Sequence, residues 1–217
     1  MANLFEHKFG IKEVADVAFY NQGDVKYDKS SGELTIVSGK KPVLVFTTLK
    51  TSSLEFTGET TEARGGKGNA VLMSWDHSRE ATLTLEDALL SAESLATMLS
   101  NKGASLVGDH TVISSAANGF PGTYTVVGKT YARGTDGKDH LLTFLIFKAK
   151  VQAEANFEMS ADGDPSTLNM TLKVLRCTND KVDTDMGAVD GDMIKMIIDD
   201  NTSTTEKTPA ISFPGQA

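Results

Sequence analysis

The fold class follows from Leu141-Leu-Thr-Phe-Leu-Ile-Phe-Lys-Ala-Lys-Val-Gln-Ala-Glu-Ala-Asn-Phe-Glu-Met-Ser160, in which apolar side chains recur at every second position. The odd-numbered positions are apolar almost throughout, whereas the even-numbered positions turn polar from Lys148 onward. Such alternation indicates a long β-strand with one buried face and one face in water. The first third is apolar at even positions too, so we expect it to be covered on both faces.

A dense turn signal follows this strand at Ala161-Asp-Gly-Asp-Pro165. Asp-Gly supplies a positive φ angle, and Pro165 cannot continue a strand ladder. Apolar and polar residues then alternate again from Leu168 to Val174. We therefore predict a long antiparallel hairpin over 141–177, in which 141–160 pairs with about 167–177.

Other strands are predicted at 32–37, 43–49, 53–57, 70–75, 80–85, 111–114, 123–129 and 193–198. Between two of them, the polar segment 58–69 is predicted to be a long inter-strand loop of about twelve residues. A helix is predicted at about 91–102, because Leu95, Ala96 and Leu99 recur at helical spacing. Ser91 is its expected N-cap.

The ends of the chain differ from its middle in composition. We expect an N-terminal arm over 1–30, a single β domain over 31–200 and a flexible, Ser/Thr-rich tail over 201–217. The N-terminal residues are polar and no apolar run is long enough for a membrane helix, so neither a secretory signal nor a membrane span is expected.

The net charge and the cysteine content argue against some classes of protein and some kinds of site. The 217 residues include 21 basic and 29 acidic side chains, giving a formal net charge of −8. This balance argues against a protein that grips nucleic acid by its phosphates. The single cysteine, Cys177, excludes an internal disulfide framework and a Cys-rich zinc site.

No pattern in the chain satisfies the requirements of a catalytic or metal site. Arg64-Gly-Gly-Lys-Gly68 departs from a phosphate loop twice, because Thr61 and Gly68 occupy required Gly and Ser/Thr positions. The acidic segment 180–192 misses the spacing of a calcium loop, since Gly187 stands at the fifth position counted from Asp183. The four histidines lack zinc spacing. We therefore expect no catalytic residue, metal or cofactor, and a solvated acidic loop.

Three segments carry a resemblance to a known family. They are Val71-Leu-Met-Ser-Trp-Asp-His-Ser78, then Ala81-Thr-Leu-Thr-Leu-Glu-Asp-Ala-Leu-Leu-Ser91 with Glu93-Ser-Leu95 after it, and Phe157-Glu-Met-Ser-Ala-Asp-Gly-Asp-Pro165 leading into 168–175. In this order, over roughly 43–200, the chain resembles the major tail tube proteins of long-tailed bacteriophages.

The resemblance implies a β-sandwich or barrel of two packed antiparallel sheets with one flanking helix. It also implies a non-enzymatic virion protein, made in the host bacterial cytoplasm, whose hexameric rings stack into a hollow tube. Double-stranded DNA would pass through the tube without sequence-specific binding. Expected partners are the tape measure, the tail tip or baseplate, the terminator and, in a contractile tail, a sheath.

Two sets of residues follow as site hypotheses. In that family the connection of an equivalent hairpin reaches the adjacent ring, which makes Arg64, Gly65, Gly66, Lys67 and Gly68 the expected contact loop; deleting it should leave soluble subunits that form no tubes. The polar face of 141–160 is expected to face the lumen, where acidic side chains would repel DNA phosphates. Its residues are Lys148, Lys150, Gln152, Glu154 and Glu158.

On the sequence alone, other classes of protein also remain open. A tube protein of a bacterial contractile injection or secretion system would share the architecture and move protein cargo. A head-decoration or carbohydrate-binding β-sandwich would need a cluster of exposed aromatic residues, and the chain has one Trp and four Tyr. An enzyme would need a convergent polar site.

Overall fold

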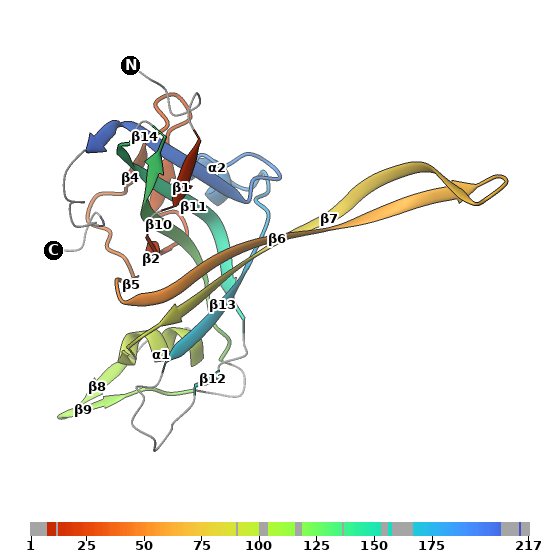
Figure 1. Ribbon diagram of the computed structural model, residues 1–217. Helices are drawn as coiled ribbons and strands as arrows, with labels where there is room; N and C mark the ends of the chain where they lie inside the picture. Colours follow the sequence, from red (N-terminus) through yellow and green to blue (C-terminus); the bar gives the residue numbers. More distant parts are fainter. Residues whose placement is uncertain are drawn as a thin grey trace.

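The computed structural model describes residues 8–11, 13–89, 91–99, 104–115, 119–135, 137–152, 156–157, 167–204 and 213. Within these residues the chain is mainly β, as predicted, with one ten-stranded antiparallel sheet, two two-stranded sheets and two short helices (Figure 1). The large sheet holds β1 (Phe9–Ile11), β2 (Asp16–Asn21), β5 (Leu44–Phe46), β6 (Leu49–Gly65), β7 (Ala70–Asp87), β10 (Thr123–Gly134), β11 (Asp139–Val151), β12 (Asn156–Phe157), β13 (Leu168–Val174) and β14 (Ile194–Thr204). The small sheets pair β3 (Val25–Tyr27) with β4 (Leu34–Ile36), and β8 (Ser105–Val107) with β9 (His110–Val112).

The large sheet provides both layers of the main core. Its strand order is β5-β2-β10-β11-β13-β7-β6, with β1 beside β10, β14 beside β11 and β12 beside β13. Phe19 and Phe46 from one end of this order share a core cluster with Leu83 and Leu85 from the other end. The two layers expected from the sequence are therefore two halves of one continuous sheet.

A β-bulge in β11 marks the change from one half to the other. Tyr124 pairs with Ala149 but Val126 pairs with Ile146, so β11 carries one extra residue there. An extra residue reverses the face to which later side chains point and bends the strand. Ile146 before the bulge and Ala149 after it consequently belong to the same core.

A second core covers the other face of β11, where Leu145 and Phe147 are almost completely buried. Its partners include Met186, Ala188 and Phe213. The prediction that the first third of 141–160 is covered on both faces is thus confirmed.

The predicted hairpin over 141–177 is confirmed only near its turn. β13 pairs with β11 from Ala149 to Val151 and with β12 at Asn156 and Phe157. Before the bulge, β11 pairs instead with β14, over 139–146. The bend at the bulge separates β11 from β13, so the pairing predicted for 141–148 was wrong. The predicted turn at 161–165 lies outside the described residues.

The N-terminal segment is not an arm, contrary to the prediction. β2 lies between β5 and β10, and Val17, Ala18, Phe19 and Tyr20 have exposed fractions of 0%. A consecutive apolar run of this kind is what a strand buried on both faces requires. Residues 1–7 and 12 lie outside the described part of the chain.

Part of the predicted C-terminal tail, 201–217, belongs to the folded structure. Residues 201–204 continue β14, and Thr204 pairs with Asp139. Phe213 is 3% exposed and belongs to the second core. Residues 205–212 and 214–217 are not among those the structure describes.

The helix is confirmed as α1 (Ala92–Leu99), and the Ser91 hydroxyl accepts the Ser94 backbone N–H at 3.0 Å. Ser91 therefore caps the helix as predicted. Met98 packs into the main core. A second helix, α2 (Lys181–Asp185), lies in the acidic segment that was predicted to be a solvated loop.

The segment 58–69 is not a loop, which corrects a further prediction. β6 runs to Gly65 and pairs with β7 from Asp87 back to Ala70, so only 66–69 form the turn. The resulting hairpin projects far beyond the body of the subunit (Figure 1). The side chains of its projecting part, residues 58–79, belong to neither core. Residues 58–69 therefore lack the apolar alternation by which strands are recognised.

Candidate assembly surface

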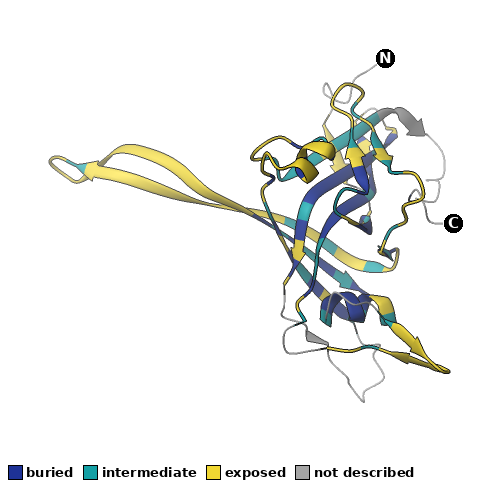
Figure 2. Cartoon of the chain, turned by 180° about the vertical axis from the view of Figure 1, so that it is seen from behind, coloured by how far each residue is buried: buried dark blue, intermediate teal, exposed yellow. Residues whose placement is uncertain are grey.

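The projecting part of the hairpin, residues 58–79, is called the arm below. Almost every residue in it is exposed, as the yellow ribbons of Figure 2 show. At about 3.3 Å per residue, the strand from Gly58 to Gly65 spans roughly 25 Å. An isolated two-stranded hairpin is at best marginally stable in water. The length and exposure of the arm therefore leave it without support from a core of its own chain.

The arm leaves the body at a second β-bulge. Thr57 pairs with Glu80 and Glu59 with His77, so β7 has an extra residue, and Ser78 adopts a φ of 55°. Such left-handed conformations are uncommon outside glycine. The Arg79 guanidinium lies over the Phe56 ring at 5.2 Å. Because bulges bend strands and increase their twist, this one sets the direction of the arm.

The two faces of the arm differ in polarity. On one face Met73 lies opposite Ala63, and Trp75 lies two residues further along the strand. Met73 is 63% exposed and Trp75 is 48% exposed. On the other face the Thr60 hydroxyl donates to the Asp76 carboxylate at 2.6 Å. We call the outer part of the first face, with Ala63, Met73 and Trp75, the apolar face of the arm; Thr61 lies opposite Trp75, and Glu59 lies opposite His77 nearer the root. Exposed apolar surface of this kind is typical of sites that contact another protein, a membrane or a ligand.

The predicted contact loop lies at the end of the arm. Arg64 and Gly65 end β6, and Gly66, Lys67 and Gly68 form the turn. The Arg64 guanidinium pairs with Glu62 at 2.6 Å, along the same strand. The structure therefore presents all five residues at the far end of a projecting hairpin, and their role in a contact stays a prediction.

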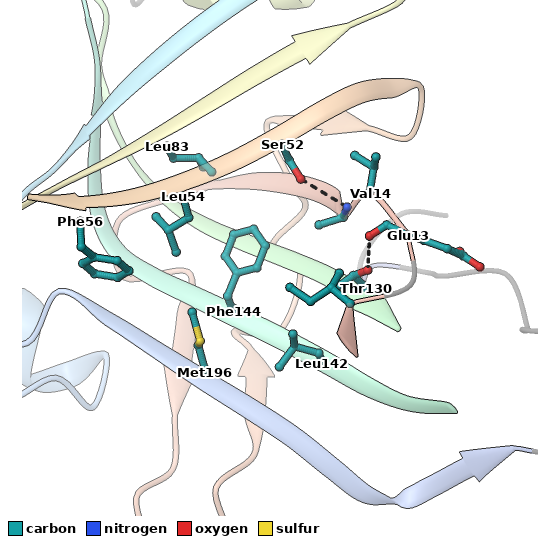
Figure 3. A pocket seen from close by; sticks show the side chains of 12 residues that line it. Glu13, Val14, Ser52, Leu54, Phe56, Leu83, Thr130, Leu142, Phe144 and Met196 are labelled. Carbon is teal, nitrogen blue, oxygen red and sulfur yellow. Dashed lines mark hydrogen bonds between the residues drawn. The ribbon is translucent and has the colours of Figure 1, made fainter. Parts of the chain in front are cut away.

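A groove of about 480 Å³ lies beside the root of the arm (Figure 3). Its walls are largely apolar and come from β1 and the segment before β2, and from β6, β7, β10, β11 and β14. We call it the groove; its lining includes Val14, Leu54, Phe56, Leu142, Phe144 and Met196. The Phe144 ring lies over Gly128, where an added Cβ would overlap the ring. Gly128 therefore allows β10 and the ring to approach closely.

The predicted lumen residues occupy different surroundings. The Lys148 ammonium is 18% exposed and pairs with the fully buried Asp183 carboxylate at 3.0 Å. Lys150 and Gln152 are exposed. Glu154 and Glu158 lie outside the residues the structure describes. Lys148 is therefore engaged in a contact within its own subunit.

The acidic segment 180–192 is a packed corner rather than a solvated loop. Asp183 accepts hydrogen bonds from the Thr178 backbone N–H at 2.7 Å and from Lys148. Burial by itself lowers the pKa of Lys148, but the hydrogen bond and charge of Asp183 outweigh it, so the pKa is raised. Lys148 thus stays charged when folded. Sequence reasoning missed this pair because its members are 35 residues apart.

Replacing Asp183 with alanine should lower the free energy of unfolding by about 3 kcal/mol, because it removes one member of a buried ion pair. Asp185→Ala is the matched control, because Asp185 pairs with Lys181 on the surface. This variant should lower the free energy of unfolding by less than about 1 kcal/mol. Urea unfolding of both variants measures the difference. Equal losses would contradict the structural role of Asp183.

The Cys177 thiol is completely buried, and burial raises its pKa to about 12, with the Asp183 carboxylate adding to the rise. Because the thiolate is the reactive form, the folded chain should resist iodoacetamide at about pH 8. We expect no label in the folded protein and one label per chain after unfolding, as counted by mass spectrometry. Rapid labelling of the folded chain would show that the thiol is accessible.

Within the part of the chain that the structure describes, no three His, Cys, Asp or Glu side chains are placed to hold a metal ion. Over the same residues, no helix has the length and apolar character required to cross a membrane.

Comparison with known proteins gives a family for the chain. No curated protein matches it. The YomU/Tube protein family matches residues 9–109 and 107–189, which together make up most of the 217 residues. The match supports the coarser part of the resemblance, a tube-type structural protein of a phage with a non-enzymatic role. The chain therefore belongs to the YomU/Tube protein family.

Proposed function

We propose that this protein is the major subunit of a phage tail tube, in which hexameric rings stack into a conduit for genomic DNA. The single observation that carries the proposal is the arm, which extends an exposed apolar face away from the body. A surface of this kind needs a partner, and a contact between two different surfaces of one chain generates rings or open stacks. Membership of the YomU/Tube family supports the same conclusion.

Negative-stain electron microscopy of the purified chain, together with its size-exclusion profile, tests this function. We expect rings or hollow tubes, formed spontaneously or after addition of a tail-tip complex that nucleates them. A particle that stays monomeric at high concentration and also in the presence of the tail tip would overturn the proposal. The proposed location is the virion tail, with the tape measure, terminator and tail-tip proteins as partners.

The lumen hypothesis is kept for Lys150, Gln152, Glu154 and Glu158, without Lys148. We expect that reversing the charge of Glu154 and Glu158 together slows DNA ejection, because a basic lumen attracts phosphate. Ejection kinetics of phage carrying the double variant measure this effect. Unchanged kinetics would remove these two residues from the lumen.

A further inference from the structure

We propose that the groove of one subunit receives the apolar face of another subunit's arm, with Met73 and Trp75 as the anchoring side chains. This inference rests on the proposed function, since it names the surface to which the arm binds. Methionine and aromatic residues are typical anchors at the centres of protein interfaces. The groove offers them a concave apolar site of about 480 Å³.

The arm cannot fill the groove of its own subunit. Phe56, which lines the groove, lies at the root of the arm, while Met73 lies opposite Ala63, seven residues further along β6. At about 3.3 Å per residue, this places Met73 roughly 23 Å from the root. The arm also points away from the body (Figures 1 and 2). The occupant must therefore come from a second copy of the chain.

The rims of the two surfaces carry one pair of opposite charges, Glu13 and Lys67. The arm also bears Glu59, Glu62 and Asp76, and the Arg79 guanidinium lies over Phe56 of the groove. Glu13 belongs to the lining of the groove and lies at its edge in Figure 3. Lys67 lies in the turn at the end of the arm. Opposite charges at the rim of an apolar contact favour one orientation and speed association. Because arm and groove are different surfaces, each subunit uses both, and the contact repeats in one direction.

Trp75 is the single tryptophan of the chain, so its fluorescence reports the surroundings of the arm. We expect a blue shift of Trp75 emission on assembly, as the indole leaves water. Met196→Lys places a charge in the groove at a side chain that is 60% exposed, so the fold should survive. This variant should raise the concentration needed for assembly at least about tenfold and abolish the shift. Leu106→Lys, at a 76% exposed residue of β8, is the matched control.

A mixing experiment tests whether the contact joins arm to groove. Met73→Lys disables the arm and leaves the groove intact, whereas Met196→Lys does the reverse. Each variant alone should fail to stack. Mixed together, the intact arms of one variant can enter the intact grooves of the other, so paired particles should form that do not elongate. Sedimentation and electron microscopy distinguish these pairs from long stacks.

The outcomes separate this inference from the function on which it rests. If the unchanged chain forms tubes and Met196→Lys forms them equally well with the same Trp75 shift, the groove is not the binding surface, and the proposed function stands. If tubes form with no shift of Trp75, the arm does not enter an apolar site, and the inference is wrong. If the unchanged chain forms no tubes even with a tail tip, the function and the inference fail together.

Discussion

Removing the arm is expected to abolish tube formation while leaving the subunit folded. The variant joins Thr57 to Glu80 by an Asn-Gly turn, because these two residues are paired neighbours just inside the bulge. The deleted residues, 58–79, are almost all exposed and contribute no side chain to either core. We therefore expect the free energy of unfolding to change by less than about 1 kcal/mol. Urea unfolding, sedimentation and electron microscopy measure stability and assembly separately.

The shorter deletion, 64–68, is a graded comparison for the same prediction. It removes the turn and keeps Met73 and Trp75. If the five-residue loop makes the contact, as the sequence predicted, this variant should form no tubes; if the apolar face makes it, stacking should only be weakened. Tubes of normal length from the armless variant would show that the arm is not the stacking contact. Unfolding of the armless variant would show that the arm supports the fold.

Gly187→Ala is expected to cause the largest loss of subunit stability, about 3 kcal/mol or more. Gly187 has a φ of +82°, a conformation that costs an L-residue about 1–2 kcal/mol. An added Cβ would in addition overlap the backbone carbonyl oxygen of Tyr27. That carbonyl cannot withdraw easily, because the Tyr27 N–H donates to the Met186 carbonyl at 2.9 Å. Overpacking then adds to the strain.

Gly191→Ala separates these two causes. Gly191 has a φ of +89°, but a Cβ built there meets nothing within 4 Å. Gly191→Ala should therefore lower the free energy of unfolding only by the cost of the left-handed conformation, about 1–2 kcal/mol. Chemical denaturation of both variants gives the difference, which measures the contact between the α2 corner and β3. Equal losses would mean that the Tyr27 backbone moves freely to accommodate the methyl group.

The sequence predicted several core strands, but it assigned the buried β2 to an N-terminal arm and correctly predicted 70–75 as a strand although it meets no core. β11 was recognised because Leu145 and Val151 belong to a long alternation, and α1 because its apolar residues recur at helical spacing with Ser91 as cap. The bulge in β11 cannot be recognised in the sequence, because the odd-numbered residues remain apolar on both sides of it. The change of partner from β13 to β14 depends on that bulge, so the pairing could not be derived.

The first half of the arm, 58–65 in β6, was missed for the opposite reason, whereas 70–75 in β7 was predicted as a strand. A hairpin that projects into water needs no alternation of apolar residues, and Glu59 to Glu62 are polar or charged. The pairing register of the arm can be assigned only as a continuation of the β6–β7 pairing inside the body. In the structure, the five residues of the expected contact loop lie at the far end of the arm. The groove assembles from six separate segments of the chain, which no local pattern connects.

The order of pairing along the chain has a consequence for synthesis on the ribosome. β6 and β7 are consecutive and pair locally, whereas β2 must wait for β10, and β11 must wait for β14. Local contacts form sooner than those that close long loops. The arm therefore acquires its strand pairing while much of the chain is still being made, and the groove is completed only when Met196 has emerged. A nascent chain can thus offer an arm to finished subunits before it can accept one.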